Sequence, residues 1–119
     1  MKNTFYRLSA NPEGGMQPYK EVAVESFTTD DHTETINTHF ETSDESITVG
    51  VWECAPCRVE FESYPDHEMM TVISGSLILT GPDGRSETYT VGDTFFVAKG
   101  TKCTWENTET FKKFYMIAA

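Results

Sequence analysis

Short β-type runs separated by closely spaced glycine turns constrain the fold of this chain more than any other feature. From residue 47 onward, runs rich in Val, Ile, Thr and aromatic residues are interrupted by turns at Gly75, 81–84, Gly92 and Gly100. No segment shows the sustained period of a long helix. Many short strands with turn signals predict an all-β protein, either an antiparallel sandwich or a barrel. The expected strands cover residues 48–53, 58–64, 69–74, 76–80, 87–90, 94–98, 102–106 and 111–117.

The N-terminal part of the chain has a different texture. Residues 1–46 are polar, rich in Thr, Asp and Glu, and only weakly periodic, with one short strand expected over residues 19–27. A chain of 119 residues is long enough for one sizeable core and too short for two. We therefore expect a single domain, in which residues 1–46 form a polar extension that packs on a barrel made by residues 47–119.

Charge and cysteine content argue against several classes of protein. Nineteen acidic and nine basic residues give a net charge of −10, which argues against binding to nucleic acid or to an anionic membrane surface. No apolar run approaches the ~20 residues of a transmembrane helix, and Met1-Lys-Asn-Thr lacks the apolar block of a signal peptide. Three cysteines are too few for a disulfide framework. These observations predict a cytoplasmic protein.

The expected strand over residues 58–64 alternates strongly. Side chains two residues apart share one face of a strand. One face therefore carries the polar side chains of Arg58, Glu60, Glu62 and Tyr64. Val59 and Phe61 share the opposite face. Two interpretations follow: the polar face is a solvated surface, or it lines a barrel interior while another strand or subunit covers the apolar face. The residues that follow in the sequence favour the second interpretation.

Two glycine-spaced segments resemble the two signature motifs of the cupin superfamily. In the first, Glu68 is followed after six residues by Gly75; in the second, Gly92, Gly100 and Asn107 have the cupin spacing. The resemblance implies a cupin double-stranded β-helix, that is, a jelly-roll barrel. It also implies four metal-ligand positions, which in this chain fall on Glu62, Tyr64, Glu68 and Cys103. The histidines that cupins commonly place there are absent.

A narrower set of residues resembles the (S)-ureidoglycine aminohydrolase and ethanolamine-utilisation cupins. The matching positions are residues 50–54, 64–65, Glu68, 72–75, 92–93, 95–96, 99–100, Trp105 and 112–115. The resemblance implies an enzyme that acts in the barrel pocket on a small polar nitrogenous or carboxylate metabolite. The implied catalytic residues are Glu62, Glu68 and Tyr64. Arg58, Cys103 and Trp105 are the implied ligand-binding residues. Glu62 and Glu68 would form an acid–base pair, because each of two close carboxylates raises the other's pKa.

The four ligand positions lead to two alternatives for the cofactor. Two carboxylates, a phenol and a thiol are a poor match to the histidine-rich sets that hold transition metals. We therefore expect either no cofactor or a weakly bound Mn, Zn or Fe ion. The competing function is a non-catalytic, metal-free module that binds a small molecule. Small cupins commonly pair through their sheets, so the expected partners are a small-molecule ligand and a second copy of the chain, and neither nucleic acid nor membrane.

Cys54-Ala-Pro-Cys57 and Lys112-Lys113 leave further alternatives open. The C-x-x-C segment is interpreted first as two incidental, exposed turn cysteines, because no helix follows it as in a redox motif and only Cys103 remains to complete a zinc site. The alternative is a regulatory or adventitious disulfide between them. The two lysines are either a solvated pair, or one of them counters the charge of an acidic pocket.

Overall fold

The computed structural model describes residues 5–119. Its elements are β1 (Gln17–Pro18), the 3-10 helix η1 (Val24–Ser26), β2 (Glu34–Glu41), β3 (Ile47–Cys54), β4 (Cys57–Phe61), β5 (His67–Ser74), β6 (Leu77–Thr80), β7 (Ser86–Tyr89), β8 (Thr94–Val97), β9 (Cys103–Asn107) and β10 (Phe111–Ala118). In this part of the chain no helix is long and apolar enough to cross a membrane.

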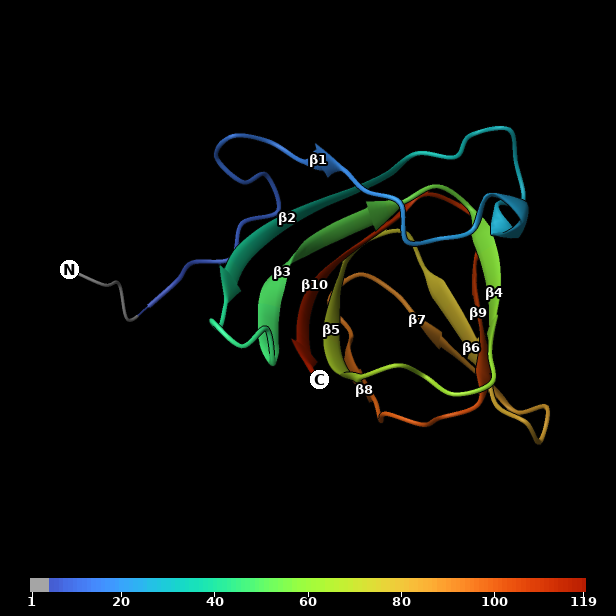
Figure 1. Ribbon diagram of the computed structural model, residues 1–119. Helices are drawn as coiled ribbons and strands as arrows, with labels where there is room; N and C mark the ends of the chain where they lie inside the picture. The colour runs from blue at the N-terminus through green and yellow to red at the C-terminus, as the bar shows by residue number, and fades with distance from the viewer. Residues whose placement is uncertain (1–4) are drawn as a thin grey trace.

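The strands form two antiparallel sheets that face each other across a barrel (Figure 1). One sheet has six strands in the order β1-β2-β3-β10-β5-β8, and the other has four in the order β4-β9-β6-β7. The all-β jelly-roll prediction is confirmed. Side chains alternate between exposed and buried in β8, and between buried and half-buried in β9, because each sheet presents one face to the core and the other to the surface.

Residues 19–27 do not form the expected strand. They contain η1, and the preceding β1 is only two residues long. The main strand of the N-terminal part is β2, which pairs with β3 and so extends the six-stranded sheet. Its sequence, Glu-Thr-Ile-Asn-Thr-His-Phe-Glu, is too polar to stand out as a strand, and its position depends on pairing with β3 rather than on its own pattern.

Gly75 shows why a turn between the two sheets requires glycine. It joins β5 of one sheet to β6 of the other with a positive φ of 78°. A Cβ atom at this position would collide with the backbone oxygen of Thr110, which lies next to β10. Only glycine fits both the backbone conformation and this close approach.

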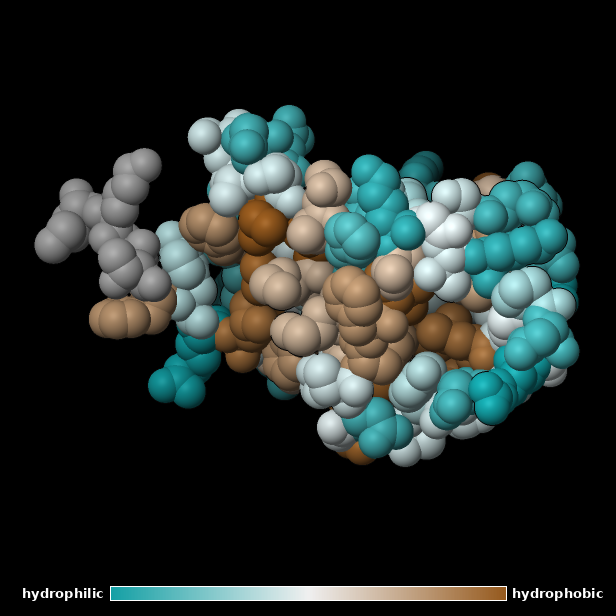
Figure 2. Space-filling model, turned by 90° about the horizontal axis from the view of Figure 1, so that it is seen from below, coloured by the Kyte–Doolittle hydropathy of each residue, from teal (hydrophilic) through white to brown (hydrophobic). Residues whose placement is uncertain are grey.

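The two sheets differ in their outer surfaces. The six-stranded sheet exposes Met69, Phe96 and Met116, whose strands are neighbours. Figure 2, which views the molecule from below, shows apolar side chains gathered on the part of the surface that belongs to the six-stranded sheet. Hydrophilic side chains dominate the right-hand side, where the four-stranded sheet lies. Val59 and Phe61 line the barrel interior, so their face of β4 needs no second subunit to cover it. The homodimer stays a prediction.

Candidate functional site

A cavity of about 720 Å³ lies inside the barrel. This volume is within the range of ligand pockets, roughly 300–1,000 Å³. Aromatic side chains from both sheets and from the loop before β5 form much of its wall, namely Trp52, Phe61, Tyr64, Trp105 and Tyr115. The cavity therefore has the mixture of apolar walls and a few polar groups that is typical of small-molecule sites.

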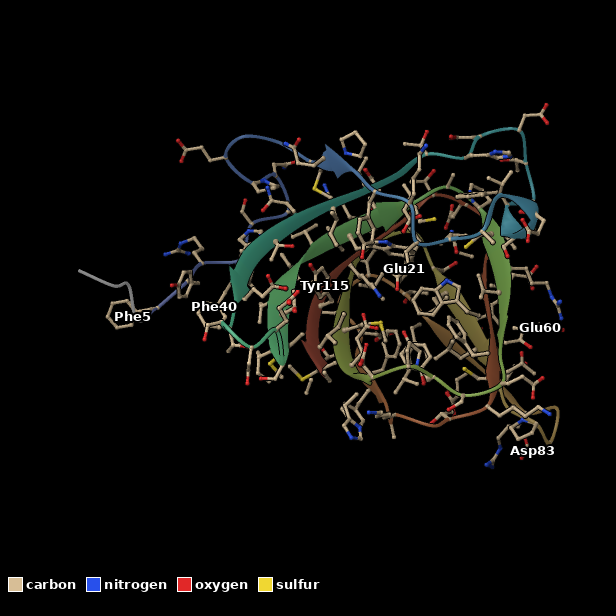
Figure 3. All side chains as sticks on the ribbon, in the orientation of Figure 1. Phe5, Glu21, Phe40, Glu60, Asp83 and Tyr115 are labelled. Atoms are coloured by element: carbon tan, nitrogen blue, oxygen red, sulfur yellow. The ribbon has the colours of Figure 1, made fainter. Side chains whose placement is uncertain are left out.

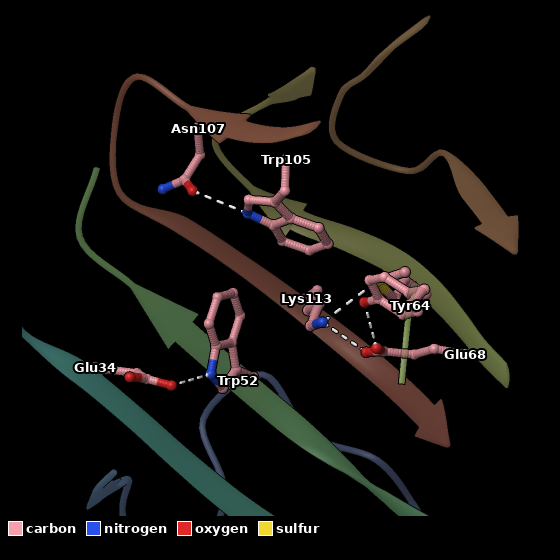
Figure 4. Close-up of polar contacts among 8 residues, drawn as sticks. Glu34, Trp52, Tyr64, Glu68, Trp105, Asn107 and Lys113 are labelled. Atoms are coloured by element: carbon pink, nitrogen blue, oxygen red, sulfur yellow. Dashed lines mark hydrogen bonds and ion pairs between the residues drawn. The ribbon is translucent and has the colours of Figure 1, made fainter. Parts of the chain in front are cut away.

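Three buried polar side chains meet on the wall of the cavity (Figure 4). The Tyr64 hydroxyl donates a hydrogen bond to Glu68 Oε1 at 2.7 Å. The Lys113 ammonium lies 2.6 Å from Glu68 Oε2 and 3.2 Å from Met70 Sδ. Glu68, Tyr64 and Lys113 are 6%, 5% and 6% exposed, so both oxygens of the carboxylate are engaged away from bulk water.

Local strand geometry brings these groups together. Glu68 and Met70 are two residues apart on β5, and Lys113 and Tyr115 are two residues apart on the neighbouring β10. Pairing of Tyr115 with Met70 places these side chains on the same, inward face of the sheet. Tyr64 lies in the loop before β5 and is fixed by two backbone hydrogen bonds, from its N–H to Thr101 and from Gly100 to its carbonyl.

Two tryptophan rings enclose the Lys113 ammonium. Its nitrogen lies 4.7 Å from the ring centroid of Trp52 and 4.8 Å from that of Trp105, which are cation–π distances. The two rings meet edge to face at 5.9 Å. Their indole nitrogens are fixed by hydrogen bonds, from Trp52 to Glu34 Oε2 at 2.9 Å and from Trp105 to Asn107 Oδ1 at 3.2 Å. The positive charge is thus held in a rigid aromatic wall.

The environment keeps Tyr64 protonated. Burial raises the pKa of the Tyr64 phenol far above its usual value near 10, and the negative charge of Glu68 and the hydrogen bond to it raise the pKa further. A protonated phenol is a hydrogen-bond donor and a poor metal ligand. In this site Tyr64 therefore acts as a donor to Glu68.

Arg58 and Glu62 lie outside the barrel, so the prediction that they face its interior is wrong. Arg58 forms an ion pair with Glu60 at 3.3 Å, and Figure 3 shows Glu60 pointing away from the barrel. The Glu62 side chain is 86% exposed and lies 3.5 Å from Lys102. Alternation itself holds from Arg58 to Glu62, because Val59 and Phe61 point into the barrel while Arg58, Glu60 and Glu62 point outward. The prediction is wrong because the bend at residues 62–63 breaks the alternation, so that Tyr64 enters the core without the other three.

The two residues predicted on β9 are both buried but lie in different places. Trp105 lines the main cavity, as expected. Cys103 lines a smaller hollow of about 260 Å³ together with Glu62 and Lys102. Burial raises the pKa of the Cys103 thiol above its usual value. Of the four ligand positions, Tyr64 and Glu68 are the two that make direct contact, so the expected convergence of all four on one cavity is wrong.

These residues do not fit a divalent metal. The Lys113 ammonium lies 2.6 Å from Glu68, where it would repel a second cation. Tyr64 is held in its protonated form, and Glu62 faces solvent. Within residues 5–119, no cluster of three or more His, Cys, Asp and Glu side chains could hold a metal ion. The lysine itself supplies positive charge at the ligand positions implied by the cupin resemblance.

Sequence reasoning left Lys113 undecided and missed Glu21 and Glu34. A signal for Lys113 was present, because Phe111 and Tyr115 flank it at a spacing of two and so share its face. Glu34 is 4% exposed and accepts hydrogen bonds from the Glu21 and Val22 amides as well as from Trp52. No local pattern in the polar N-terminal part distinguishes these carboxylates from their solvated neighbours.

Cys54 and Cys57 are fully buried, so the prediction of exposed turn cysteines is wrong. The turn between β3 and β4 is covered by residues 27–33, through backbone hydrogen bonds from Thr28 to Pro56 at 3.1 Å and from Ala55 to Thr33 at 2.8 Å. The Cys57 thiol donates to Asn107 Oδ1 at 3.1 Å. A hydrogen bond with Cys57, together with burial, raises the pKa of the Cys54 thiol.

We expect the three cysteines of the folded protein to react slowly with a thiol reagent, with Cys103 reacting first. Cys103 is 8% exposed whereas Cys54 and Cys57 are 0% exposed, and a buried thiol reacts only when the structure opens. Timed alkylation followed by peptide mass spectrometry measures the order, with urea-unfolded protein as the control in which all three react. Faster labelling of Cys54 or Cys57 would contradict the covered turn.

Comparison with known proteins agrees with this fold. Residues 41–115 match the family model of the EutQ-like cupin domain. A protein of unknown function of the DUF861 family, from Pseudomonas syringae pv. tomato, is 28% identical over 93% of this chain with a TM-score of 0.81, and the match covers 46% of that protein. This chain thus spans about half the length of that relative. The search of curated proteins gave no match.

Two more distant structures show the same fold. The EutQ protein of Clostridium difficile is 20% identical, with a TM-score of 0.61 and coverage of 83% of this chain and 80% of that one. A putative ethanolamine utilization protein Q of Salmonella typhimurium is 13% identical, with a TM-score of 0.65 and coverage of 96% and 94%. The predicted resemblance to small cupins of this subgroup is confirmed. Because the family model matches more than half of the residues of the chain, the chain belongs to the EutQ-like cupin domain family.

Proposed function

We propose that this cupin binds a small polar nitrogenous or carboxylate metabolite in its barrel and carries out acid–base chemistry on it, as an enzyme of the ureidoglycine aminohydrolase type. The observation that supports this most is the buried contact of Glu68 with Tyr64 and Lys113 on the wall of a ligand-sized cavity. Clustered ionisable groups in a semi-enclosed cavity are characteristic of catalytic sites.

The three side chains have complementary roles in this proposal. Glu68 accepts hydrogen bonds on both oxygens and is the proton acceptor. It takes a proton from the attacking water and returns it to the leaving amino group. Tyr64 positions this carboxylate through its hydrogen bond, since its phenol stays protonated. Lys113 places a positive charge beside the reacting group, where it stabilises negative charge that develops on an oxygen of the substrate. In an aminohydrolase reaction, water replaces an amino group on carbon and ammonia leaves.

The test is ammonia release from a panel of small compounds that carry amino, amidino or ureido groups, measured with and without the protein. We expect turnover of a member of the panel, and we expect Glu68→Gln to lower kcat about 100-fold or more, as for loss of a general base. Glu60→Gln is the matched control, because Glu60 lies on the outer face of β4. Full activity in Glu68→Gln, or saturable binding without turnover of any compound, would contradict the enzymatic proposal.

A further inference from the structure

The charge on the cavity wall is strongly unbalanced. Among residues 5–119, Lys113 is the one basic residue on the wall, and five acidic residues line it: Glu21, Glu41, Glu45, Asp66 and Glu68. The charge of Lys113 is already matched by Glu68 at 2.6 Å. The remaining four carboxyl groups give the cavity an excess of negative potential, which attracts cations and repels anions.

Glu21 is held at the cavity by a specific set of contacts. The segment that follows β1 crosses the opening of the barrel towards η1 beside β4, and Figure 3 shows Glu21 at this opening. Glu34 Oε1 accepts the backbone N–H groups of Glu21 at 3.0 Å and Val22 at 2.9 Å. Because Glu34 also holds the Trp52 indole through its other oxygen, the segment is fixed to the cavity wall itself.

The carboxyl group of Glu21 has no cationic partner within 4.0 Å among residues 5–119. Glu21 is an exposed residue at the opening, and the partial burial of its carboxyl group raises its pKa. Lys113 and a hydrogen bond from Tyr19 oppose this shift, while the charges of Glu34 and Glu68 add to it. Tyr19 and Tyr115 also line the cavity, and aromatic faces favour a positive group. Glu21 thus presents, at the mouth of an acidic and aromatic cavity, a carboxylate that no ion pair among residues 5–119 neutralises.

We propose that Glu21 binds a protonated amino group of the ligand, so that the metabolite is a compact cation rather than a carboxylate. This inference rests on the proposed use of the barrel cavity as the ligand site. The ammonium group of the ligand contacts Glu21 at the opening, and the rest of the molecule extends between the aromatic walls towards Glu68 and Tyr64. Glu21 is then the residue that selects the charge of the ligand.

The chain contains its own optical probe for this test. It has two tryptophans, Trp52 and Trp105, and both line the cavity. Tryptophan fluorescence therefore reports on ligands that enter the barrel. The probes are n-propylammonium chloride, sodium propionate and neutral propionamide, which have similar size and differ in charge, each titrated at constant ionic strength.

We expect saturable binding of n-propylammonium, with an affinity about tenfold higher than that of propionate, and an approximately tenfold loss in Glu21→Gln. The affinity for propionamide should be unchanged by this substitution. Glu25→Gln removes the same charge from the same segment at an exposed position outside the cavity, and it should bind n-propylammonium as the wild type does.

The outcomes separate this inference from the proposed function. Tighter binding of propionate than of n-propylammonium, or unchanged binding in Glu21→Gln, would overturn the role of Glu21 and leave the cavity as a ligand site. A similar loss in Glu25→Gln would also overturn it, because the effect would then come from net charge alone. If none of the three probes changes the fluorescence at any concentration, both the inference and the use of the cavity are contradicted.

Discussion

Replacing Lys113 with methionine is expected to lower the free energy of unfolding by about 3 kcal/mol or more, the cost of leaving a buried charge without its partner. The side chains of Lys113 and Glu68 are each only 7% exposed. Methionine keeps an unbranched stem of similar length between the tryptophan rings, so the main loss is the charge opposite Glu68. Urea unfolding followed by circular dichroism measures the change.

The double variant Lys113→Met with Glu68→Gln is the control for this prediction. Removing both charges of a buried pair is often close to neutral, whereas removing one leaves an uncompensated charge. We therefore expect the double variant to recover much of the stability lost in Lys113→Met. A loss below about 1 kcal/mol in the single variant, the value of an exposed ion pair, would contradict a buried and functional contact.

Asn107→Leu is expected to cost more than any other single polar substitution in the barrel, several kcal/mol. Asn107 is fully buried. Its amide nitrogen donates to the carbonyls of Ala55 at 3.1 Å and Glu109 at 3.0 Å, and its oxygen accepts from Cys57 and Trp105. Each buried partner left without a hydrogen bond costs roughly 1–3 kcal/mol. The same urea experiment measures the loss.

Asn37→Leu is the matched control for this substitution. The Asn37 side chain donates a single exposed hydrogen bond, to Gly15 at 2.9 Å, so its loss should cost less than about 1 kcal/mol. Similar losses in the two variants would mean that the buried network around Asn107 does not hold the β3–β4 turn. The Asn107 variant should also shift the fluorescence of Trp105, because it removes the acceptor of the indole N–H.

The fold could be predicted from the sequence because its signals are local. Turns such as Gly75 and Gly92 require positive φ, and alternation within runs such as Thr94–Val97 defines the inward face of each strand. The position of β2 could not be predicted, because its polar residues are placed by pairing with β3. Pairing between segments that are separated in sequence leaves little trace in the pattern of either one.

The site could be predicted only in part, for the same reason. Tyr64 and Glu68 were found from their spacing to Gly75, and the structure brings them into contact. Glu62 could not be placed in the same way, because the bend at residues 62–63 puts it on the outer face with Arg58 while Tyr64, two residues later, is buried. The expected repulsion between Glu62 and Glu68 is therefore wrong, since Glu62 pairs with Lys102 at the surface and Glu68 with Lys113 inside the barrel.

The central claim is that the positive charge at the centre of this barrel is the Lys113 ammonium and that folding does not depend on a metal. Elemental analysis of untagged protein, combined with thermal unfolding before and after treatment with a chelator, tests it most directly. We predict substoichiometric Mn, Zn and Fe and an unchanged Tm, because the core and the ion pair with Glu68 stabilise the fold. Close to one metal ion per chain, lost on chelation together with several degrees of Tm, would contradict the account and favour a metalloenzyme.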